Sequence, residues 1–400
     1  MDLFNRRDLV AAAFNIPPMK RFLFLLLLPP LLAGCKKDIS NPVSDQPPTT
    51  FGQAFDEFWN QVNVNYVYWD IDTTDWNAVY QQYKPLFSSL RLGDTADLRR
   101  SAGYFRQMTD GLTDHHFSIT FTDGVLRDSS IIPAYDQYRL DPAFRNPYSY
   151  LGSDVGYLDS GYLTGLDNTT DPGNTLEAAT GTINGKILFF TCTRFNLSAS
   201  WQSSTLNGVQ PVLQYFFQRL QSPSGLTAIL LDFRDNPGGD VNDLNFLAGQ
   251  FTTQPLHFGY TRNKSGNGQL DYTPWINANV SPQAGAQDVT LPIYILVDKY
   301  SQSMAEIMTM ALRALPQCKV IGETTFGATG PFAANALYDD GPFDIPGFLS
   351  VTTSSVEFKY INGKIYEGKG FPPDYPVAFN LQSLDSGIDP QLNKALSLVQ

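Results

Sequence analysis

The stretch Leu291-Pro-Ile-Tyr-Ile-Leu-Val297, followed by Ser301-Gln-Ser-Met-Ala-Glu306, decides the fold of this chain. The first run is short, apolar and rich in β-forming residues, which predicts a buried strand. Ser303 with Glu306 three residues later matches a capping box, which predicts that a helix begins there. A second apolar strand is expected at Val320-Ile321. The order strand, tight turn, helix, strand indicates a layered α/β core.

Ser303 lies at the turn of this unit. Backbone N–H groups at a helix N-terminus have no partner within the helix and point outward. A serine nucleophile at this position would therefore have an oxyanion donor beside it. The alternative is that Ser303 only caps the helix, because serine is a preferred N-cap residue.

The composition limits the class of protein. The chain has 400 residues, of which 42% are hydrophobic and 16% charged, so a large core is expected. Its net charge of −12 argues against nucleic acid as a partner. There are three histidines, and no cluster has metal-ligand spacing, so neither a metal nor a cofactor is expected.

The N-terminus predicts export and a lipid anchor. Met19-Lys20-Arg21 precedes an apolar run, Phe22 to Ala33, that is too short to span a bilayer. The run ends in Leu32-Ala33-Gly34-Cys35, which resembles a bacterial lipobox with Cys35 as the lipidated residue. Residues 1–34 are then a lipoprotein signal peptide, with 1–18 as an upstream extension. The protein is expected in the cell envelope, lipid-anchored at the outer membrane of a Gram-negative bacterium, on either face of that membrane. The alternative is that residues 1–34 are an ordinary secretory signal without lipidation.

Four further segments follow the leader. Residues 35–50 contain several prolines and read as a linker. Aromatic residues at helical spacing predict three amphipathic helices and a small helical domain over 51–112. Residues 113–182 read as a strand and loop-rich region without an evident PDZ domain, and 183–400 as the α/β core. Cys192 and Cys318 form either a disulfide or two buried thiols.

Within the core, apolar runs predict strands at 185–192 and 228–233, and Pro211 predicts a helix start. Residues 254–290 read as long polar connections. Two β-rich additions are expected at 348–358 and 360–366, with Asn362-Gly363 as a hairpin turn.

Four separated motifs carry a family resemblance. They are Leu112-x-Asp114-x-His116, Asp232-Phe-Arg-Asp-Asn-Pro-Gly-Gly239, Ser301-Gln-Ser-Met-Ala-Glu306 and Gly322-Glu-Thr-Thr-Phe-Gly327. Their order resembles the C-terminal-processing (tail-specific) serine peptidases. The resemblance implies a ClpP/crotonase-like α/β core, Ser303 as the nucleophile, and an oxyanion hole from the N–H of Met304 and of Gly238 or Gly239.

The chain departs from the better-known Ser–Lys branch of that family, because Ala328 stands where that branch has its lysine. A serine hydroxyl needs a positioned base. The chain is similar instead to the tricorn protease branch, which implies His116 as the base and Glu367, in Glu367-Gly-Lys-Gly-Phe-Pro-Pro-Asp374, as the orienting acid. The roles then follow the logic of a catalytic triad.

The leading hypothesis is a lipid-anchored serine endopeptidase of the cell envelope that acts on protein or peptide substrates. Two alternatives stay open: a binding lipoprotein on an inactive peptidase fold, and an esterase using the same site. The missing lysine favours the binding protein, whereas Ser303, His116 and Glu367 together favour the enzyme.

Overall fold

The structure is a computed structural model that describes residues 46–332 and 341–399. The expected signal peptide (1–34), its extension 1–18, the lipidation site Cys35 and most of the linker 35–50 lie outside the described residues. Within the two described ranges, every helix is too short or too polar to cross a membrane.

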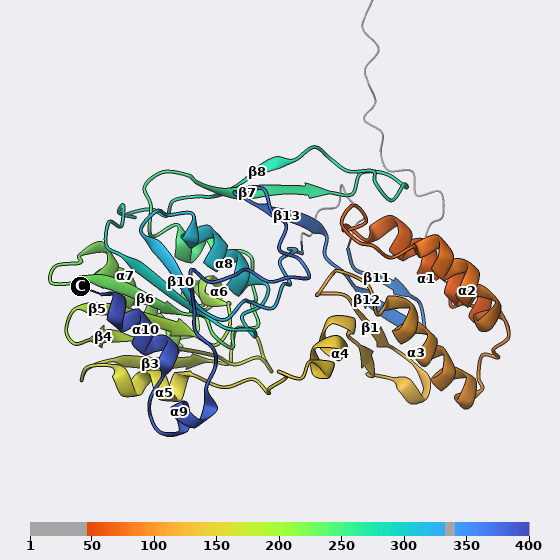
Figure 1. Cartoon of the computed structure of the whole chain (residues 1–400), viewed down its shortest axis with the longest axis horizontal. Helices are drawn as coiled ribbons and strands as arrows, with labels where there is room; N and C mark the ends of the chain where they lie inside the picture. The colour runs from red at the N-terminus through yellow and green to blue at the C-terminus, as the bar shows by residue number, and fades with distance from the viewer. Residues whose placement is uncertain (1–45, 333–340, 400) are drawn as a thin grey trace, which may run out of the picture. The chain divides into compact units, whose positions relative to one another are not determined.

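A seven-stranded sheet forms the α/β part, in the order β14-β10-β9-β6-β5-β4-β3 (Figure 1). The strands β14, β10, β9, β6 and β5 run parallel to one another, whereas β4 pairs antiparallel with both β5 and β3. Their bounds are β3 Leu163–Asp167, β4 Leu176–Ile183, β5 Ile187–Cys192, β6 Ala228–Asp232, β9 Ile293–Val297, β10 Cys318–Gly322 and β14 Tyr375–Pro376. Parallel strands are buried on both faces and read as continuous apolar runs, which is why β5, β6 and β9 could be predicted.

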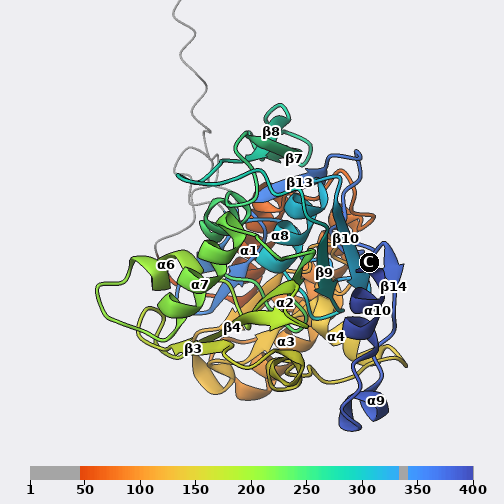
Figure 2. The same cartoon turned by 90° about the vertical axis from the view of Figure 1, so that its left-hand side faces the viewer.

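Helices cover both faces of this sheet, so alternate residues of each strand enter different cores. Leu231 and Ile295 pack in one core with Met308, whereas Leu230 and Leu296 pack in the other with Leu392. Figure 2 shows α8 and α10 on opposite sides of β9 and β10. The helical elements of this part are α6 Leu197–Gln202, α7 Val209–Gln221, the short π-helix η3 Leu244–Ala248, α8 Met304–Arg313, α9 Leu381–Asp385 and α10 Pro390–Leu398. The α/β class is confirmed.

The expected N-terminal helices are confirmed as α1 (Phe51–Asn65), α2 (Trp76–Ser88) and α3 (Thr95–Thr109). Their aromatic residues pack in one core with an antiparallel sheet of order β11-β12-β1-β2. The bounds of these strands are β1 Ser118–Phe121, β2 Ser130–Ile131, β11 Phe343–Ile345 and β12 Leu349–Thr352. Residues 343–352, expected inside the 183–400 core, therefore complete the N-terminal sheet instead, because Ser118 and Phe121 pair with Thr352 and Leu349.

The expectation of polar connections over 254–290 was wrong. This region contains β7 (Leu256–Asn263) and β8 (Ile276–Val280), which form a third sheet with β13 (Val356–Tyr360). These two strands are largely half-buried or exposed, so their sequences lack the apolar alternation that reveals a strand. The 113–182 region also contains η1 (Gly124–Leu126), α4 (Pro133–Leu140), α5 (Leu151–Asp154) and η2 (Val155–Tyr157).

The predicted strand 348–358 is interrupted. Its two halves, β12 and β13, belong to different sheets and are joined by the buried polar residues Thr353, Ser354 and Ser355. Residues 361–363 form a turn, as expected, but the segment after them is not a strand. Cys192 and Cys318 are both buried and free, so the thiol alternative holds and the disulfide does not.

Candidate active site

Ser303 lies at a sharp turn between β9 and α8 and has an unusual backbone conformation. Its backbone has φ 54° and ψ −118°, and Met304 begins the helix directly after it. A positive φ is uncommon outside glycine and costs free energy, so the surrounding loop has to impose it. Two hydrogen bonds do so: Ser301 Oγ donates to the Phe233 carbonyl at 2.7 Å, and the Gln302 N–H donates to the Asn236 carbonyl at 2.9 Å.

The buried carboxylate of Asp298 ties the same loop to the turn after β6. Its Oδ1 accepts the N–H groups of Asp235 at 2.9 Å and Tyr300 at 3.0 Å. Its Oδ2 accepts Arg145 Nη2 at 2.8 Å, which balances the buried charge. The serine turn and the Gly-Gly turn are therefore held against each other by one side chain.

Gly238 approaches the Ser303 turn, and Gly239 approaches Phe195, more closely than a side chain would allow. Their φ angles are 94° and 144°. A Cβ at Gly238 would lie 2.6 Å from Ser303 Cβ and 2.7 Å from the Met304 nitrogen, and one at Gly239 would lie 1.8 Å from the Phe195 carbonyl oxygen. Glycine is thus required at both positions.

The two glycines differ as oxyanion donors. The N–H of Gly238 already donates to Asn236 Oδ1 at 2.9 Å. The N–H groups of Gly239 and Met304 make no hydrogen bond to any residue that the structure describes. Both residues line the pocket that contains Ser303, so this pair is free to bind an oxyanion there.

A pocket of about 90 Å³ opens beside Ser303. Apart from the backbone donors, its walls are mainly apolar side chains: Val241, Ile307, Ala328 and Phe332. No lysine lines it among the described residues, as the alanine at position 328 leads one to expect.

His116 does not line this pocket itself but contacts Phe332 in its wall, and the centroids of the two rings are 4.7 Å apart. Its Nδ1 is 3.4 Å from Ser354 Oγ, whereas its Nε2 is buried and has no partner among the described residues. Burial lowers the pKa of His116, although the charge of Asp114 acts in the opposite direction. The ring is therefore neutral near pH 7 and able to accept a proton. It makes no hydrogen bond to Ser303 in this structure.

His115 has a different environment, as its position one residue earlier predicts. Its Nδ1 lies 2.8 Å from the Phe326 carbonyl oxygen, and its backbone N–H donates to Glu367 Oε1 at 2.8 Å. A carbonyl oxygen can only accept, so this contact places the ring proton of His115 on Nδ1.

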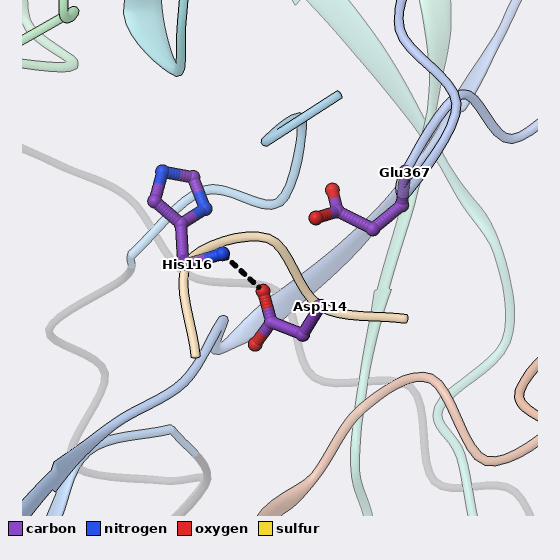
Figure 3. Close-up of side chains that lie close together, drawn as sticks. All are labelled: Asp114, His116 and Glu367. Carbon is purple, nitrogen blue, oxygen red and sulfur yellow. Dashed lines mark hydrogen bonds between the residues drawn. The ribbon is translucent and has the colours of Figure 1, made fainter. Parts of the chain in front are cut away.

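Glu367 is fully buried and points toward His116, and the carboxylate of Asp114 lies near both of them (Figure 3). It makes no hydrogen bond to the ring. Its Oε1 accepts the His115 N–H, and its Oε2 accepts four donors, from Tyr68, Thr329 and Gly330. Burial and the charge of Asp114 raise the pKa of Glu367 well above its usual range. The structure therefore brings the acid to the histidine without the direct contact that an orienting acid is expected to make.

Asp114, His116 and Glu367 each offer one ligand atom within 4.8 Å of the others, which is a metal-like grouping. The two carboxylates, however, already accept hydrogen bonds from protein donors, four at Asp114 and five at Glu367. Their lone pairs are therefore occupied, and the cluster fits the support of a histidine better than it fits a cation.

Glu306 connects the nucleophile to the segment that follows Phe326. Its carboxylate accepts the N–H of Ser303 at 3.1 Å, of Gly327 at 2.8 Å and of Ala328 at 2.8 Å, and Thr325 Oγ1 at 2.5 Å. Burial raises its pKa to about 7, against the lowering effect of these donors. The capping residue predicted from the sequence is thus also a link across the site.

Comparison with known proteins agrees with this geometry. Residues 193–377 match the profile described as Peptidase family S41, and residues 47–94 match the Tricorn protease C1 domain. The family S41 profile covers less than half of the chain, so the similarity to this family holds for residues 193–377. A crystal structure of a candidate peptidase from Parabacteroides merdae has a TM-score of 0.66 at 22% identity and covers 88% of this chain and 97% of its own. The crystal structure of mature CPAF has a TM-score of 0.54 at 12% identity and covers 87% of this chain and 95% of its own. Both solved structures therefore share the fold of this chain.

Two curated relatives are similar over a shorter region. The carboxy-terminal processing protease CtpA of Bacillus subtilis is 31% identical over 151 residues, which are 38% of this chain and 30% of the relative. A probable CtpA-like serine protease of Staphylococcus aureus is 32% identical over 155 residues, 38% of this chain and 28% of the relative. The chain thus aligns with less than a third of the length of these relatives.

We expect Glu306→Gln to destabilise the protein strongly. A glutamine offers one acceptor and one NH₂ group where four donors converge on two carboxylate oxygens, so at least one buried donor loses its partner. The free energy of unfolding in urea should fall by about 3 kcal/mol. The matched control is Glu177→Gln at an exposed carboxylate, which should change it by less than about 0.5 kcal/mol. Equal losses in the two variants would contradict the role of Glu306.

Proposed function

We propose that this protein is a serine endopeptidase that cleaves peptide bonds through an acyl-enzyme on Ser303. One observation carries the proposal: Ser303 is held at positive φ before a helix, with the two unpaired N–H groups of Met304 and Gly239 beside it. The similarity of residues 193–377 to peptidase family S41 supports the same reaction class. The apolar pocket next to Ser303 suits an apolar side chain of a peptide substrate.

In the proposed reaction, Ser303 Oγ attacks the scissile carbonyl and His116 Nε2 takes its proton. The oxyanion is stabilised by the N–H groups of Met304 and Gly239. His116 then gives the proton to the leaving amine, and a water molecule activated by the same nitrogen hydrolyses the ester. Substrate binding has to bring Ser303 and His116 into hydrogen-bond contact, as catalytic pairs often do only in the complex. Glu367 lies near His116, and its hydrogen-bond donors favour the ionised form against the burial that raises its pKa, so an ionised Glu367 would stabilise the imidazolium.

We also propose that the protein is anchored in the cell envelope through lipid on Cys35, at the outer membrane. The support is the lipobox-like Leu32-Ala33-Gly34-Cys35 behind a basic flank and a short apolar run.

Ser303→Ala should abolish hydrolysis and labelling by a fluorophosphonate probe. The hydroxyl is the proposed nucleophile, and loss of a capping side chain costs at most about 0.5–2 kcal/mol, so the variant should stay folded. Labelling is followed by mass spectrometry of the modified peptide, and folding by thermal unfolding.

The same probe separates the alternatives. A wild-type protein that is folded but never labelled would favour the binding lipoprotein. Labelling with ester hydrolysis but no peptide hydrolysis would favour the esterase. Hydrolysis that persists in Ser303→Ala would remove Ser303 from the mechanism.

His116→Ala should lose about 10³-fold or more in turnover, because the general base is gone, whereas His115→Ala should lose far less. In the wild type, kcat/KM should fall as pH drops through the pKa of His116, since only the neutral ring can accept a proton. Burial lowers this pKa, so the fall should be centred below about 6.5, the ordinary value for histidine. Equal losses in the two variants would falsify the assignment of His116 as base.

Mass spectrometry of the envelope fraction should find Cys35 as the lipid-modified N-terminal residue. The lipobox-like motif is the reason for this expectation. Cys35→Ser should release the protein from the membrane fraction. Retention of that variant in the membrane, or a soluble product cleaved elsewhere, would rule out the lipid anchor at Cys35.

A further inference from the structure

The segment between β12 and β13 brings an additional hydroxyl group to the candidate active site. Thr353, Ser354 and Ser355 are buried, and buried hydroxyl groups need partners. Asp114 provides them: its Oδ2 accepts Thr353 Oγ1 at 2.6 Å and the Ser354 N–H at 2.7 Å, and its Oδ1 accepts Ser354 Oγ at 2.9 Å. The interruption that separates two sheets therefore fixes Ser354 beside the motif that contains His116.

The direction of the hydrogen bonds around Ser354 follows from Asp114. Its two oxygens accept four donors, so the carboxylate is ionised and can only accept. The one proton of Ser354 Oγ points to Asp114 at 2.9 Å, rather than to the Gly330 carbonyl at 3.4 Å. Ser354 Oγ is then left as an acceptor for His116 Nδ1, 3.4 Å away.

We infer that Ser354 and Asp114 are positioning residues that hold the proton of His116 on Nδ1 and leave the lone pair of Nε2 free for Ser303. The chain of hydrogen bonds runs from His116 Nδ1–H to Ser354 Oγ and from Ser354 Oγ–H to Asp114 Oδ1. Asp114 also accepts the backbone N–H of His116 at 2.9 Å, so one carboxylate fixes both the ring and its backbone.

Two observations favour this path over direct orientation by Glu367. The oxygens of Glu367 are occupied by Tyr68, His115, Thr329 and Gly330, and it makes no hydrogen bond to the ring. The Nε2 atom, in contrast, is buried without a partner, as expected for a basic nitrogen that awaits a donor. Ser354 thus assumes the orienting role that the family resemblance assigns to the acid.

This inference rests on the proposed function, but its first test does not require activity. The chain has three histidines, so ¹⁵N-histidine labelling of the full-length protein gives a simple spectrum. At a pH where the ring is neutral, the His116 resonances, assigned by their loss in His116→Ala, should show a protonated Nδ1 and an unprotonated Nε2. A wild-type ring that is protonated on Nε2 would overturn the inference whatever the activity.

The variants then test the role of the hydroxyl group. Ser354→Ala should mix the two tautomers and lower kcat by about 10²-fold with little change in KM, because the fraction of ring able to act as base falls. Ser354→Thr keeps the hydroxyl group and should restore both readouts. The matched control is Ser355→Ala, also buried but not hydrogen-bonded to His116 or Asp114, which should leave both unchanged.

The outcomes separate this inference from the proposed function. If Ser354→Ala folds and keeps both the tautomer and kcat, the inference is wrong while the peptidase can stand. If the tautomer shifts as expected but no form of the protein hydrolyses peptides or reacts with the probe, the positioning chain is supported and the proposed function fails. If Ser354→Ala does not fold, two measurements still test the inference. They are the tautomer of His116 in the wild type and the tautomer and kcat of Ser354→Thr.

Discussion

Two buried carboxylates hold the same short stretch of backbone from opposite sides, and the site depends on this arrangement. Glu306, on the nucleophile helix, accepts the N–H groups of Gly327 and Ala328. Glu367, from the segment after β13, accepts the next two, of Thr329 and Gly330. Four consecutive N–H groups thus fix the spacing between the Ser303 turn and the acid beside His116. Because buried N–H groups are costly to leave unpaired, this spacing is set by hydrogen bonding rather than by side-chain packing.

The site concentrates negative charge without a cation among its described contacts. Asp114, Glu306 and Glu367 are all fully buried, and each is stabilised by backbone N–H and hydroxyl donors. Such donors favour the ionised form, and at Glu306 and Glu367 they oppose the burial that raises the pKa. The resting imidazole of His116 is kept neutral by burial, yet the proton it would gain during reaction lies close to two carboxylates. Under the proposed mechanism, the same surroundings would favour a neutral His116 before the reaction and stabilise its imidazolium during it.

The sequence predicted the parts of this site that belong to single motifs. The buried strands β6 and β9, the helix after Ser303 and the two glycines are each local patterns with a physical reason. What could not be predicted depends on contacts between distant segments. Nothing local distinguishes Gly238 from Gly239 as a donor, because the side chain of Asn236 decides it. Ser354 was hidden inside an apparent strand, since the break between β12 and β13 follows from their pairing with different sheets. The strands β7 and β8 were missed because neither is buried enough to need an apolar face.

The departure at Ala328 becomes understandable in this arrangement. Ala328 is buried in the wall of the pocket, and its N–H is held by Glu306, so this position supplies backbone support and apolar surface. The proposed base, His116, lies between α3 and β1, outside both regions that match family profiles. His116 depends on β1, β1 pairs with β12, and β12 leads into Ser354. Under the proposed mechanism, a chain without the lysine needs its helical part and the β12 strand in place for the site to be complete, because the α/β core would supply the nucleophile and the oxyanion hole whereas the base, His116, precedes β1.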